Sequence, residues 1–297
     1  MKSEKFFRQK ISPYNLLIIA ALALFALFTV YPLYNVLLVS VTSYRDSTLS
    51  GFYLLPRSIN FSSYEYIFTD ATVPRGFLVT TAVTFFGVLY NMFLSITMGY
   101  ALSKRNYPGR NFFMYMVILT MIFNGGLIPY YIVVNSLGLV DRIASMIIPV
   151  GINTFYMILL MNYFRNIPDS IEESAKIDGA SDITVLARIV LPISKPILAT
   201  VVLFYAVDRW NEYFNAMLFV RSPENMPIQM ILRNMLVNMQ TSISSSMGSL
   251  IVGAREPVYT QGVRMAIVVV TSLPILMFYP FLQKYFTKGI MLGSIKA

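Results

Sequence analysis

The residues with the most distinctive types and spacing lie in one polar stretch between long apolar segments of this chain. Glu173, Ala175 and Gly179 have the spacing Glu-x-Ala-x-x-x-Gly, and the pattern Ile-x-Leu-Pro follows and ends in Leu191 and Pro192. A glycine between two short helices lets a partner surface approach the backbone closely, because glycine has no side chain. The spacing therefore predicts the chemistry of docking rather than that of bond breaking.

Helix start and stop signals divide this stretch around Gly179. Asp169 or Ser170 is expected to cap a first helix, since each is followed three residues later by a glutamate. Glu172 and Lys176 have the i,i+4 spacing of a stabilising ion pair. Gly179 stands where a helix stops in a left-handed residue, so the first helix should end there.

A second short helix is expected over residues 183–190. Ser181 or Asp182 can begin it, and Pro192 is expected to end it because proline interrupts helical hydrogen bonding. The apolar residues that could form a contact face are Ile171, Ala175, Ile183, Ala187 and Val190. Together the two helices predict a compact knob.

A second polar group lies inside an otherwise apolar segment. Its members are Asp208, Arg209, Trp210, Asn211, Glu212 and Tyr213. Ionisable residues within a membrane span are costly and are candidates for function. Asp208 and Glu212 are expected to share a helical face beside Arg209, so these charges could neutralise one another. The aromatic rings could stack on sugar rings, and Asn211 could bond to hydroxyl groups; the alternative is an ion pair that only fixes packing. Further candidates for a cargo pathway are Asn124, Asn153 and Tyr156.

The composition indicates what surrounds these groups. Hydrophobic residues make up 56% of the 297 residues, more than a soluble domain of this size can bury, so the bilayer is the expected solvent. Charge-free runs that reach the roughly 18–20 residues needed to cross the hydrocarbon core are 11–44, 76–103, 111–140, 143–164 and 265–283. The segment 196–220 is also long enough, although it contains the second polar group. Six spans are expected.

Local signals refine these spans. Helices are expected over 14–41, 75–102, 111–134, 143–164 and 196–220, with Pro32 able to kink the first. The third of these helices should be broken at Asn124-Gly125-Gly126 and Pro129. The break could form a cavity wall or gate, or it could be only a packing kink. A short interfacial helix is expected to begin at Ser62-Ser63-Tyr64-Glu65.

The connection 221–261 is expected to contain an amphipathic helix over 228–239. That helix could lie on the membrane surface, or it could contact an external protein or the cargo. The Ser/Thr/Gly-rich run 241–249 is expected to be mobile.

Charge sets the expected orientation. The net charge is +9, and basic residues gather in the N-terminal tail, in the turn 104–110 and in the C-terminal tail, which predicts that both termini are cytoplasmic. Residues 165–195 lie on the same side but carry four positive and five negative charges, a balance that indicates a protein partner.

The chain has no histidine and no cysteine, so thiol chemistry and the usual base at neutral pH are excluded. A membrane enzyme is therefore disfavoured.

The docking residues carry a family resemblance. Glu173-Ser174-Ala175 with Gly179 and Ile189-x-Leu191-Pro192 is similar to the EAA motif of binding-protein-dependent ABC importer permeases. The sequence departs from the motif at Ser174, where the family usually has alanine. The carbohydrate-uptake, maltose-type subgroup is resembled by Ile167-Pro168, 172–180 and Leu191-Pro192. Within it, permeases for complex oligosaccharides or polysaccharide fragments are resembled by 125–129, Trp210-Asn211 and 288–294. The resemblance covers essentially the whole chain.

The resemblance implies an all-α membrane protein with six transmembrane helices, the type I ABC importer permease fold with cytoplasmic EAA coupling helices. The implied organisation is a cytoplasmic tail at 1–13, a permease domain at 14–286 with a coupling loop at 165–195 and an extracellular loop at 221–261, and a tail at 287–297. The location would be a bacterial cell membrane. The coupling residues implied by the motif are Glu173, Ala175, Asp178, Gly179, Ala180, Leu191 and Pro192.

The resemblance also implies a division of labour among several subunits. The chain has no Gly-x-x-x-x-Gly-Lys-Ser/Thr phosphate loop, so a partner ATPase should bind ATP and Mg, and neither a cofactor nor a metal is expected in this chain. The implied partners are a second homologous permease, two ATPase subunits and an extracellular solute-binding protein that delivers an oligosaccharide; nucleic acid is not expected. The alternatives are a permease for a non-carbohydrate solute and a self-contained secondary transporter, which would need an inverted repeat and buried carboxylates.

Overall fold

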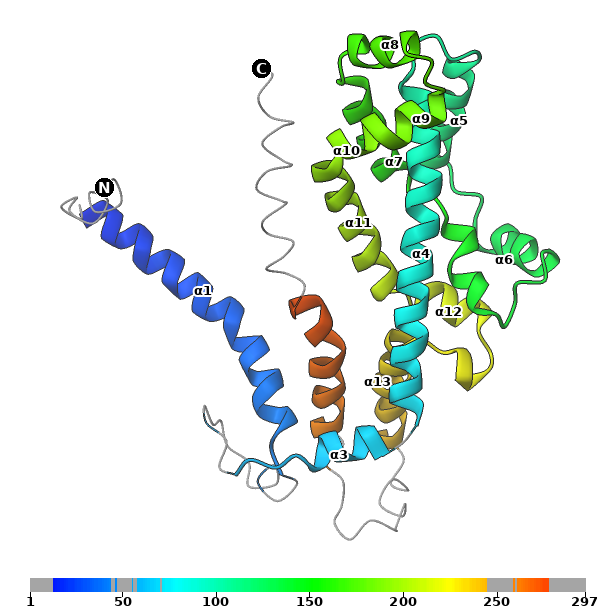
Figure 1. The fold of residues 1–297 in the computed structure, drawn as a ribbon. Coiled ribbons are helices and arrows are strands. Elements are labelled where there is room, and N and C mark those ends of the chain that lie inside the picture. Colours follow the sequence, from blue (N-terminus) through cyan, green and yellow to red (C-terminus); the bar gives the residue numbers. More distant parts are fainter. Residues whose placement is uncertain are drawn as a thin grey trace. The chain divides into compact units, whose positions relative to one another are not determined.

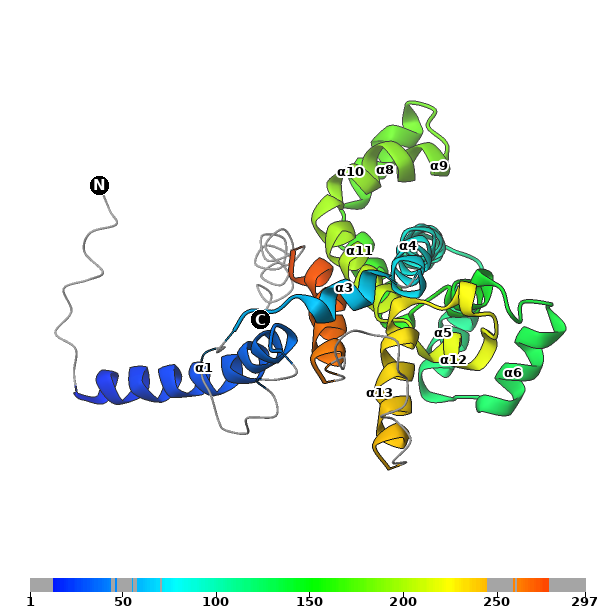
Figure 2. The same cartoon turned by 90° about the horizontal axis from the view of Figure 1, so that it is seen from below.

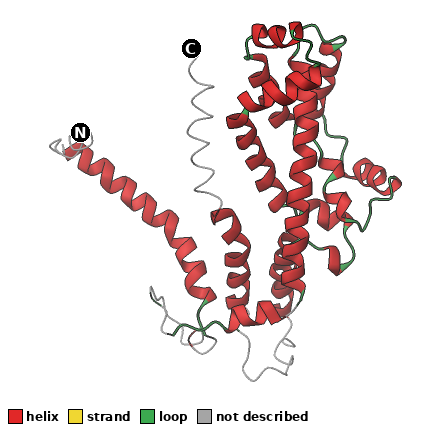
Figure 3. Cartoon of the chain, in the orientation of Figure 1, coloured by secondary structure: helices red, strands yellow, loops and turns green. Residues whose placement is uncertain are grey.

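The computed structural model describes residues 13–43, 46, 55, 58–69, 71–244, 259 and 261–277. Throughout these ranges every regular element is a helix, as Figure 3 shows, so the prediction of an all-helical protein is confirmed. The chain divides into two compact units: Met1–Thr69 with Ser242–Val270, and Asp70–Thr241 with Thr271–Ala297. All the candidate site residues belong to the second unit.

The first unit contains a long helix and a short one. α1 (Pro13–Ser40, blue in Figure 1) is charge-free, includes Pro32, and begins and ends within one residue of the prediction. α3 (Ser62–Thr69) confirms the predicted short helix. The hydroxyl groups of Ser40 and Tyr64 lie 2.8 Å apart, so a hydrogen bond joins the end of α1 to α3.

The second unit is built around α4 (Thr72–Ser103), a helix of 32 residues. α4 packs along α7 (Thr154–Arg165) and α11 (Lys195–Trp210). In Figure 2 α4 is seen nearly end-on, with α11 beside it. Gly87 permits this approach, because a Cβ atom there would lie only 2.8 Å from the side chain of Arg209. The packing of these three helices forms the main core of the unit.

The third predicted span is two helices rather than one. α5 (Arg110–Ile122) and α6 (Leu127–Ser136) meet at an angle of 118°. The side-chain oxygen of Asn124 accepts a hydrogen bond from the Gly126 N–H at 2.9 Å, and Gly126 has a φ of +88°. The predicted interruption is therefore confirmed, and it is a full turn between two helices rather than a kink within one.

The fourth and fifth predicted spans are also broken, which the prediction of continuous helices missed. Two tight 3₁₀ turns, η2 (Ile143–Met146) and η3 (Ile148–Val150), precede α7, and the segment bends by 49°. α11 ends at Trp210, and α12 (Phe214–Phe219) begins after a gap. The Glu212 carboxylate accepts the Asn215 N–H at 2.9 Å and so satisfies a free donor in the first turn of α12.

Among the described residues, α1 and α4 alone are long and apolar enough to cross a membrane as single helices. Three pairs of helices meet the same requirement of length and apolarity when each bent pair is taken as one segment. These pairs are 110–122 with 127–136, 143–150 with 154–165, and 182–193 with 195–210. The helix Gln261–Met277 is apolar and shorter, and the rest of the predicted sixth span, 278–283, lies outside the described residues.

The predicted amphipathic helix at 228–239 is the first part of α13 (Ile228–Ser244). Its first turn packs on α4: Ile228 is buried, and its N–H donates to the Thr80 hydroxyl at 2.8 Å. Gly76 leaves the space into which the Ile231 side chain fits. Residues 241–244, predicted to be mobile, are helical, while 245–249 lie outside the described residues.

A carboxylate ties two loops of the second unit together. Asp141, with a φ of +60°, accepts hydrogen bonds from the Ser222 hydroxyl at 2.5 Å, the Ser222 N–H at 2.8 Å and the Arg221 N–H at 3.0 Å. These bonds, that from the Ser222 hydroxyl first, lower the pKa of the Asp141 carboxyl from 3.8 to about 2. The loop after α6 is thereby fixed to the segment after α12.

Candidate coupling site

The docking residues form a projection at one end of the second unit, at the top of Figure 1. It consists of α8 (Asp169–Ile177), α9 (Asp182–Val185), a π-turn (Leu186–Val190) and α10 (Leu191–Ile193). We call residues 169–193 the knob. The predicted pair of short helices around a glycine is therefore present.

The start of α8 differs from the prediction. Asp169 is the first residue of the helix, and Pro168 before it provides no side-chain hydrogen bond to the free N–H groups. The prediction that Asp169 or Ser170 caps the helix is wrong. Asp169 and Glu172 nevertheless lie in the first turn, where their negative charge interacts favourably with the positive end of the helix dipole.

The end of α8 follows the prediction. Gly179 has a φ of +84°, the left-handed conformation that glycine adopts most readily. The Ala180 N–H donates to the Ala175 carbonyl at 2.9 Å, and the Gly179 N–H donates to the Lys176 carbonyl at 3.0 Å. These two bonds form a Schellman motif, which satisfies carbonyl groups that the helix end leaves open.

The second helix begins as predicted, because the Ser181 side chain accepts the Thr184 N–H at 3.3 Å. Ser181 is therefore the cap, and Asp182 is the first residue of the helix. The predicted cap fixes the direction in which the chain leaves Gly179.

Pro192 does not end this helix, contrary to the prediction. Residues 186–190 form a π-turn, in which the Leu191 N–H donates to the Leu186 carbonyl, five residues earlier. A proline ring collides with the carbonyl four residues back and supplies no N–H, and the wider π-turn accommodates both defects. The helix continues to Ile193, and the chain then bends by 86° into α11.

The inner face of the knob packs against helices of its own unit. Val185 and Val190 are buried in one apolar core with Phe164 of α7 and Tyr205 of α11, and Ala175 packs against the same core. Ala175 and Val190 are therefore not part of an external contact face, which corrects that prediction. The knob is held to the unit on this side.

The outer face of the knob is exposed and apolar. Ile177 and Ile183 are 86% and 80% exposed, and Ile171 and Ala187 are also exposed. A Cβ atom at Gly179 would meet no atom within 4 Å. Sequence reasoning missed Ile177, although its position two residues before the glycine could have indicated it. The tip thus offers a bare backbone between two isoleucines.

The other predicted coupling residues divide between exposed and half-buried positions. The exposed ones are Glu173, Asp178 and Pro192, and the half-buried ones are Ala180 and Leu191.

Glu172 forms an ion pair with Lys104, which follows α4, rather than with Lys176 as its spacing predicted. The Tyr100 hydroxyl also donates to Glu172, at 3.4 Å. Lys176 instead pairs with Asp182 at 2.7 Å. This bond lowers the pKa of Asp182 and raises the pKa of Lys176.

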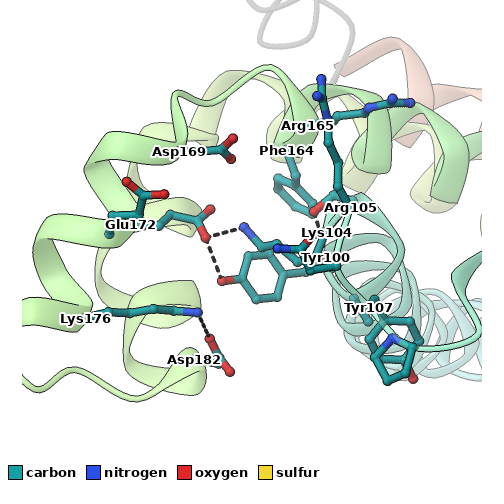
Figure 4. Close-up of a pocket in the computed structure, with 15 residues that line it drawn as sticks. Tyr100, Lys104, Arg105, Tyr107, Phe164, Arg165, Asp169, Glu172, Lys176 and Asp182 are labelled. Atoms are coloured by element: carbon teal, nitrogen blue, oxygen red, sulfur yellow. Dashed lines mark hydrogen bonds and ion pairs between the residues drawn. The ribbon is translucent and has the colours of Figure 1, made fainter.

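Both ion pairs line a cavity of about 690 Å³ between the knob and the turn after α4. Figure 4 shows Glu172 pointing from α8 toward Lys104 and Tyr100, with Lys176 and Asp182 joined beside them.

Two members of the second polar group, Arg209 and Glu212, belong to a buried network rather than to an open patch. Arg209 donates to the Met146 carbonyl at 2.9 Å, and its guanidinium lies 3.6 Å from the Glu212 carboxylate. Glu212 accepts the Asn215 side-chain amide at 2.9 Å, and Asn215 in turn accepts the Tyr130 hydroxyl at 2.6 Å. Since α11 ends at Trp210, Asp208 and Glu212 do not share a helical face, contrary to the prediction. The network joins α6 of the predicted third span and η2 of the fourth to the end of α11 and the start of α12 in the fifth.

The remaining members of this group lie apart from that network. The Trp210 indole donates to the Thr271 carbonyl at 3.1 Å. Asn211 is exposed and accepts the Gln229 side-chain amide at 3.3 Å, and Tyr213 is exposed.

The structure brings three pathway candidates together between α7 and α11. Asn153 caps α7 by accepting the Phe155 N–H at 3.0 Å, and its own N–H donates to the Tyr205 hydroxyl at 3.0 Å. The rings of Tyr156 and Tyr205 lie 5.0 Å apart, edge to face, and Asp208 lies close enough to interact with the Tyr156 hydroxyl. Asn124, by contrast, is exposed in the turn between α5 and α6.

Relatives of known name share most of this chain. It is 41% identical over 283 residues to the polygalacturonan/rhamnogalacturonan transport system permease protein YtcP of Bacillus subtilis (strain 168), covering 95% of this chain and 98% of that protein. It is 40% identical over 268 residues to protein LplC of the same organism, covering 90% of each. No protein-family model matches the chain.

Solved structures share its fold. A chain of a bacterial ABC transporter involved in the import of the acidic polysaccharide alginate superposes with a TM-score of 0.84 at 33% identity, covering 95% of this chain and 99% of that one. A chain of a bacterial alginate ABC transporter in complex with an alginate pentasaccharide-bound periplasmic protein gives a TM-score of 0.55 at 13% identity, which shows the fold alone. The chain therefore belongs to the permeases of ABC importers, membrane-embedded transport subunits rather than enzymes.

Proposed function

We propose that this chain is the permease subunit of an ATP-driven importer of an oligosaccharide or polysaccharide fragment. An extracellular solute-binding protein delivers the cargo, and a separate ATPase binds ATP and Mg. The relative named for polygalacturonan/rhamnogalacturonan and the structure named for alginate support the carbohydrate class.

The observation that carries the proposal is the form of the knob. Its inner face is buried against α7 and α11, while its tip exposes Gly179, Ile177 and Ile183. An exposed apolar tip on a rigidly held base fits a cleft in a partner protein. The ATPase docks there on the exposed coupling residues Glu173, Asp178 and Gly179, while Ala175 holds the knob to its base.

The assembly pairs this chain with a second homologous permease on two ATPase subunits. The six spans are α1, α4, the bent segments 110–136 and 143–165, α11 together with α12, and the segment that begins with Gln261–Met277. Both termini lie in the cytoplasm of a bacterial cell. The ion pair between Lys104 and Glu172 supports an even number of crossings between these residues, because it requires both to lie on the same side of the membrane.

The cargo passes beside α7 and α11, where Tyr156, Asn153 and Asp208 lie together. Tyr156 and Asp208 are half-buried, so they can still reach a passing molecule. Arg209 and Glu212 are committed to the buried network and hold the pathway in shape.

Purification from native membranes in mild detergent tests the assembly. We expect an ATPase, a second permease and a solute-binding protein to copurify with the chain, and the reconstituted complex to take up oligosaccharides from a polygalacturonan digest when ATP is supplied. A chain that purifies alone and transports without ATP would instead indicate a secondary transporter.

The absence of cysteine from the sequence allows a clean test of topology. Asn106→Cys and Glu224→Cys each introduce one exposed thiol, in the turn after α4 and in the segment before α13. A membrane-impermeant maleimide should label Glu224→Cys in intact cells and Asn106→Cys only after the membrane is opened. The reverse pattern would overturn the proposed orientation.

A further inference from the structure

Glu172 is a buried charge in an otherwise exposed helix. Its side chain is only 10% exposed, whereas its neighbour Glu173 lies on the exposed side of α8. A carboxylate removed from water is costly unless it is paired and hydrogen-bonded. Lys104 and Tyr100 supply that compensation, so Glu172 faces α4 rather than the tip of the knob.

The receiving residues are themselves fixed in place. Lys104 lies at the C-terminal end of α4, where a cation interacts favourably with the helix dipole, and its N–H donates to the Ala101 carbonyl. The Lys104 ammonium lies 4.4 Å from the centre of the Tyr100 ring, and that ring meets the Phe164 ring edge to face at 6.3 Å. The end of α4, the end of α7 and the start of α8 therefore meet at one point.

Chain connectivity gives this contact its importance. The knob is joined through the backbone to α7 at one end and to α11 at the other, but never to α4. The cavity of about 690 Å³ separates part of the knob from the turn after α4. The apolar core that contains Tyr100 also includes Val185 and Val190 of the knob. Among the described residues, the polar contacts from the knob to α4 and the residue that follows it are those of Glu172, with Tyr100 and Lys104.

We propose that the ion pair between Glu172 and Lys104 is the positioning contact through which movement of the knob reaches α4. This inference rests on the proposed function, because it assumes that an ATPase moves the knob. α4 packs along both α7 and α11. A displacement that reaches α4 together with its two neighbours therefore moves the whole helical layer as one body.

The second ion pair of the knob provides a matched comparison. Lys176 and Asp182 also join a lysine to a carboxylate, but their side chains are 51% and 72% exposed, and both belong to the knob. Their removal leaves the contact with α4 unchanged. If the loss of charge alone lowers transport, variants of both ion pairs should show similar losses. If the movement of the knob no longer reaches α4, the loss should be confined to variants of Lys104 and Glu172.

The test uses the complete transporter in proteoliposomes, with a polygalacturonan digest as cargo. The variants are Lys104→Met, Glu172→Gln and the charge exchange Lys104→Glu/Glu172→Lys, compared with Lys176→Met and Asp182→Asn. ATPase copurification, ATP hydrolysis and cargo taken up per ATP are measured together. The first two variants should retain the ATPase and its hydrolysis while uptake per ATP falls roughly tenfold, the size of a typical coupling between sites.

The charge exchange should restore part of the uptake per ATP, because it re-forms the ion pair although each charge then meets the unfavourable end of a helix dipole. The comparison variants should lose less than Lys104→Met does. Unchanged uptake per ATP in both single variants would overturn the proposal, and so would a charge exchange no better than the single variants. If a single variant also loses the ATPase, recovery of both properties in the exchange supports the positioning role, and its failure refutes it. A wild-type complex that recruits no ATPase would instead refute the proposed function.

Discussion

The exposed glycine of the knob allows docking to be separated from folding. Gly179 has a φ of +84°, and a Cβ atom there would meet no atom within 4 Å. The cost of Gly179→Asp within the chain is therefore backbone strain, about 1–2 kcal/mol for an L-residue in the left-handed conformation. Aspartate tolerates this conformation better than most residues, so the knob should still fold. The new carboxylate would nevertheless occupy the surface that the ATPase approaches.

Gly138 provides the matched control. It has a φ of +67°, and a Cβ atom there would also meet no atom within 4 Å. Gly138→Asp therefore introduces similar strain, but in the turn after α6 rather than in the knob. Any difference between the two variants in ATPase binding must come from the position of the side chain rather than from backbone strain.

The assay compares both variants with the wild type in three measurements: the unfolding midpoint in detergent, copurification of the ATPase and uptake of cargo. Both variants should lose similar stability, and only Gly179→Asp should lose the ATPase and uptake. Wild-type ATPase binding by Gly179→Asp would refute the docking argument. Equal loss of binding in Gly138→Asp would show that strain rather than occlusion is responsible.

Three further predictions concern residues outside the knob. Arg209→Met leaves Glu212 charged and buried, so the free energy of unfolding should fall by about 3–5 kcal/mol; chemical denaturation should show partial recovery in Arg209→Met/Glu212→Gln, and no recovery would contradict the pairing. Because the folded pKa of Asp141 is about 2, below its usual 3.8, its stabilisation is complete above 3.8 and is lost as the pH falls toward 2. The unfolding midpoint of the wild type should therefore fall over this range more steeply than that of Asp141→Asn, and identical pH profiles would count against the loop contact. Trp210→Phe should cost about 1 kcal/mol of stability through the lost hydrogen bond to Thr271, while Trp210→Ala should lower uptake more than the yield of complex; equal losses would indicate a purely structural role.

The local features of the knob could be read from the sequence because their causes are local. A positive φ at Gly179 and a cap at Ser181 depend on residues within a few positions of each other, so spacing alone predicts them. The partner of Glu172 could not be predicted in this way. Local spacing favoured Lys176, whereas Lys104 lies far away in sequence and comes near only after α4 and α7 have packed.

The breaks in the spans were less predictable for a different reason. Apolar composition satisfies the requirements of a membrane segment equally well whether the helix is straight or bent. The turn at Asn124 was foreseen because glycines and a proline mark it, but the gap after Trp210 carries no such signal. It is stabilised by Glu212, which bonds to Asn215 and Arg209 nearby in sequence. Those two residues are in turn held by Tyr130 and Met146, which are distant in sequence and come near only in the folded chain.

The π-turn at Leu186–Val190 lets the chain hold one residue more than a regular α-helix would between Asp182 and Ile193. An α-turn closes its hydrogen bond over four residues and a π-turn over five, so the extra residue widens one turn and leaves the helix on either side facing as before. Loss of one residue from 186–190 would therefore restore an ordinary turn with little change in the direction that Gly179 faces. It would, however, place Pro192 in a turn that its ring and its missing N–H disfavour, so the widened turn is what allows a proline inside the knob.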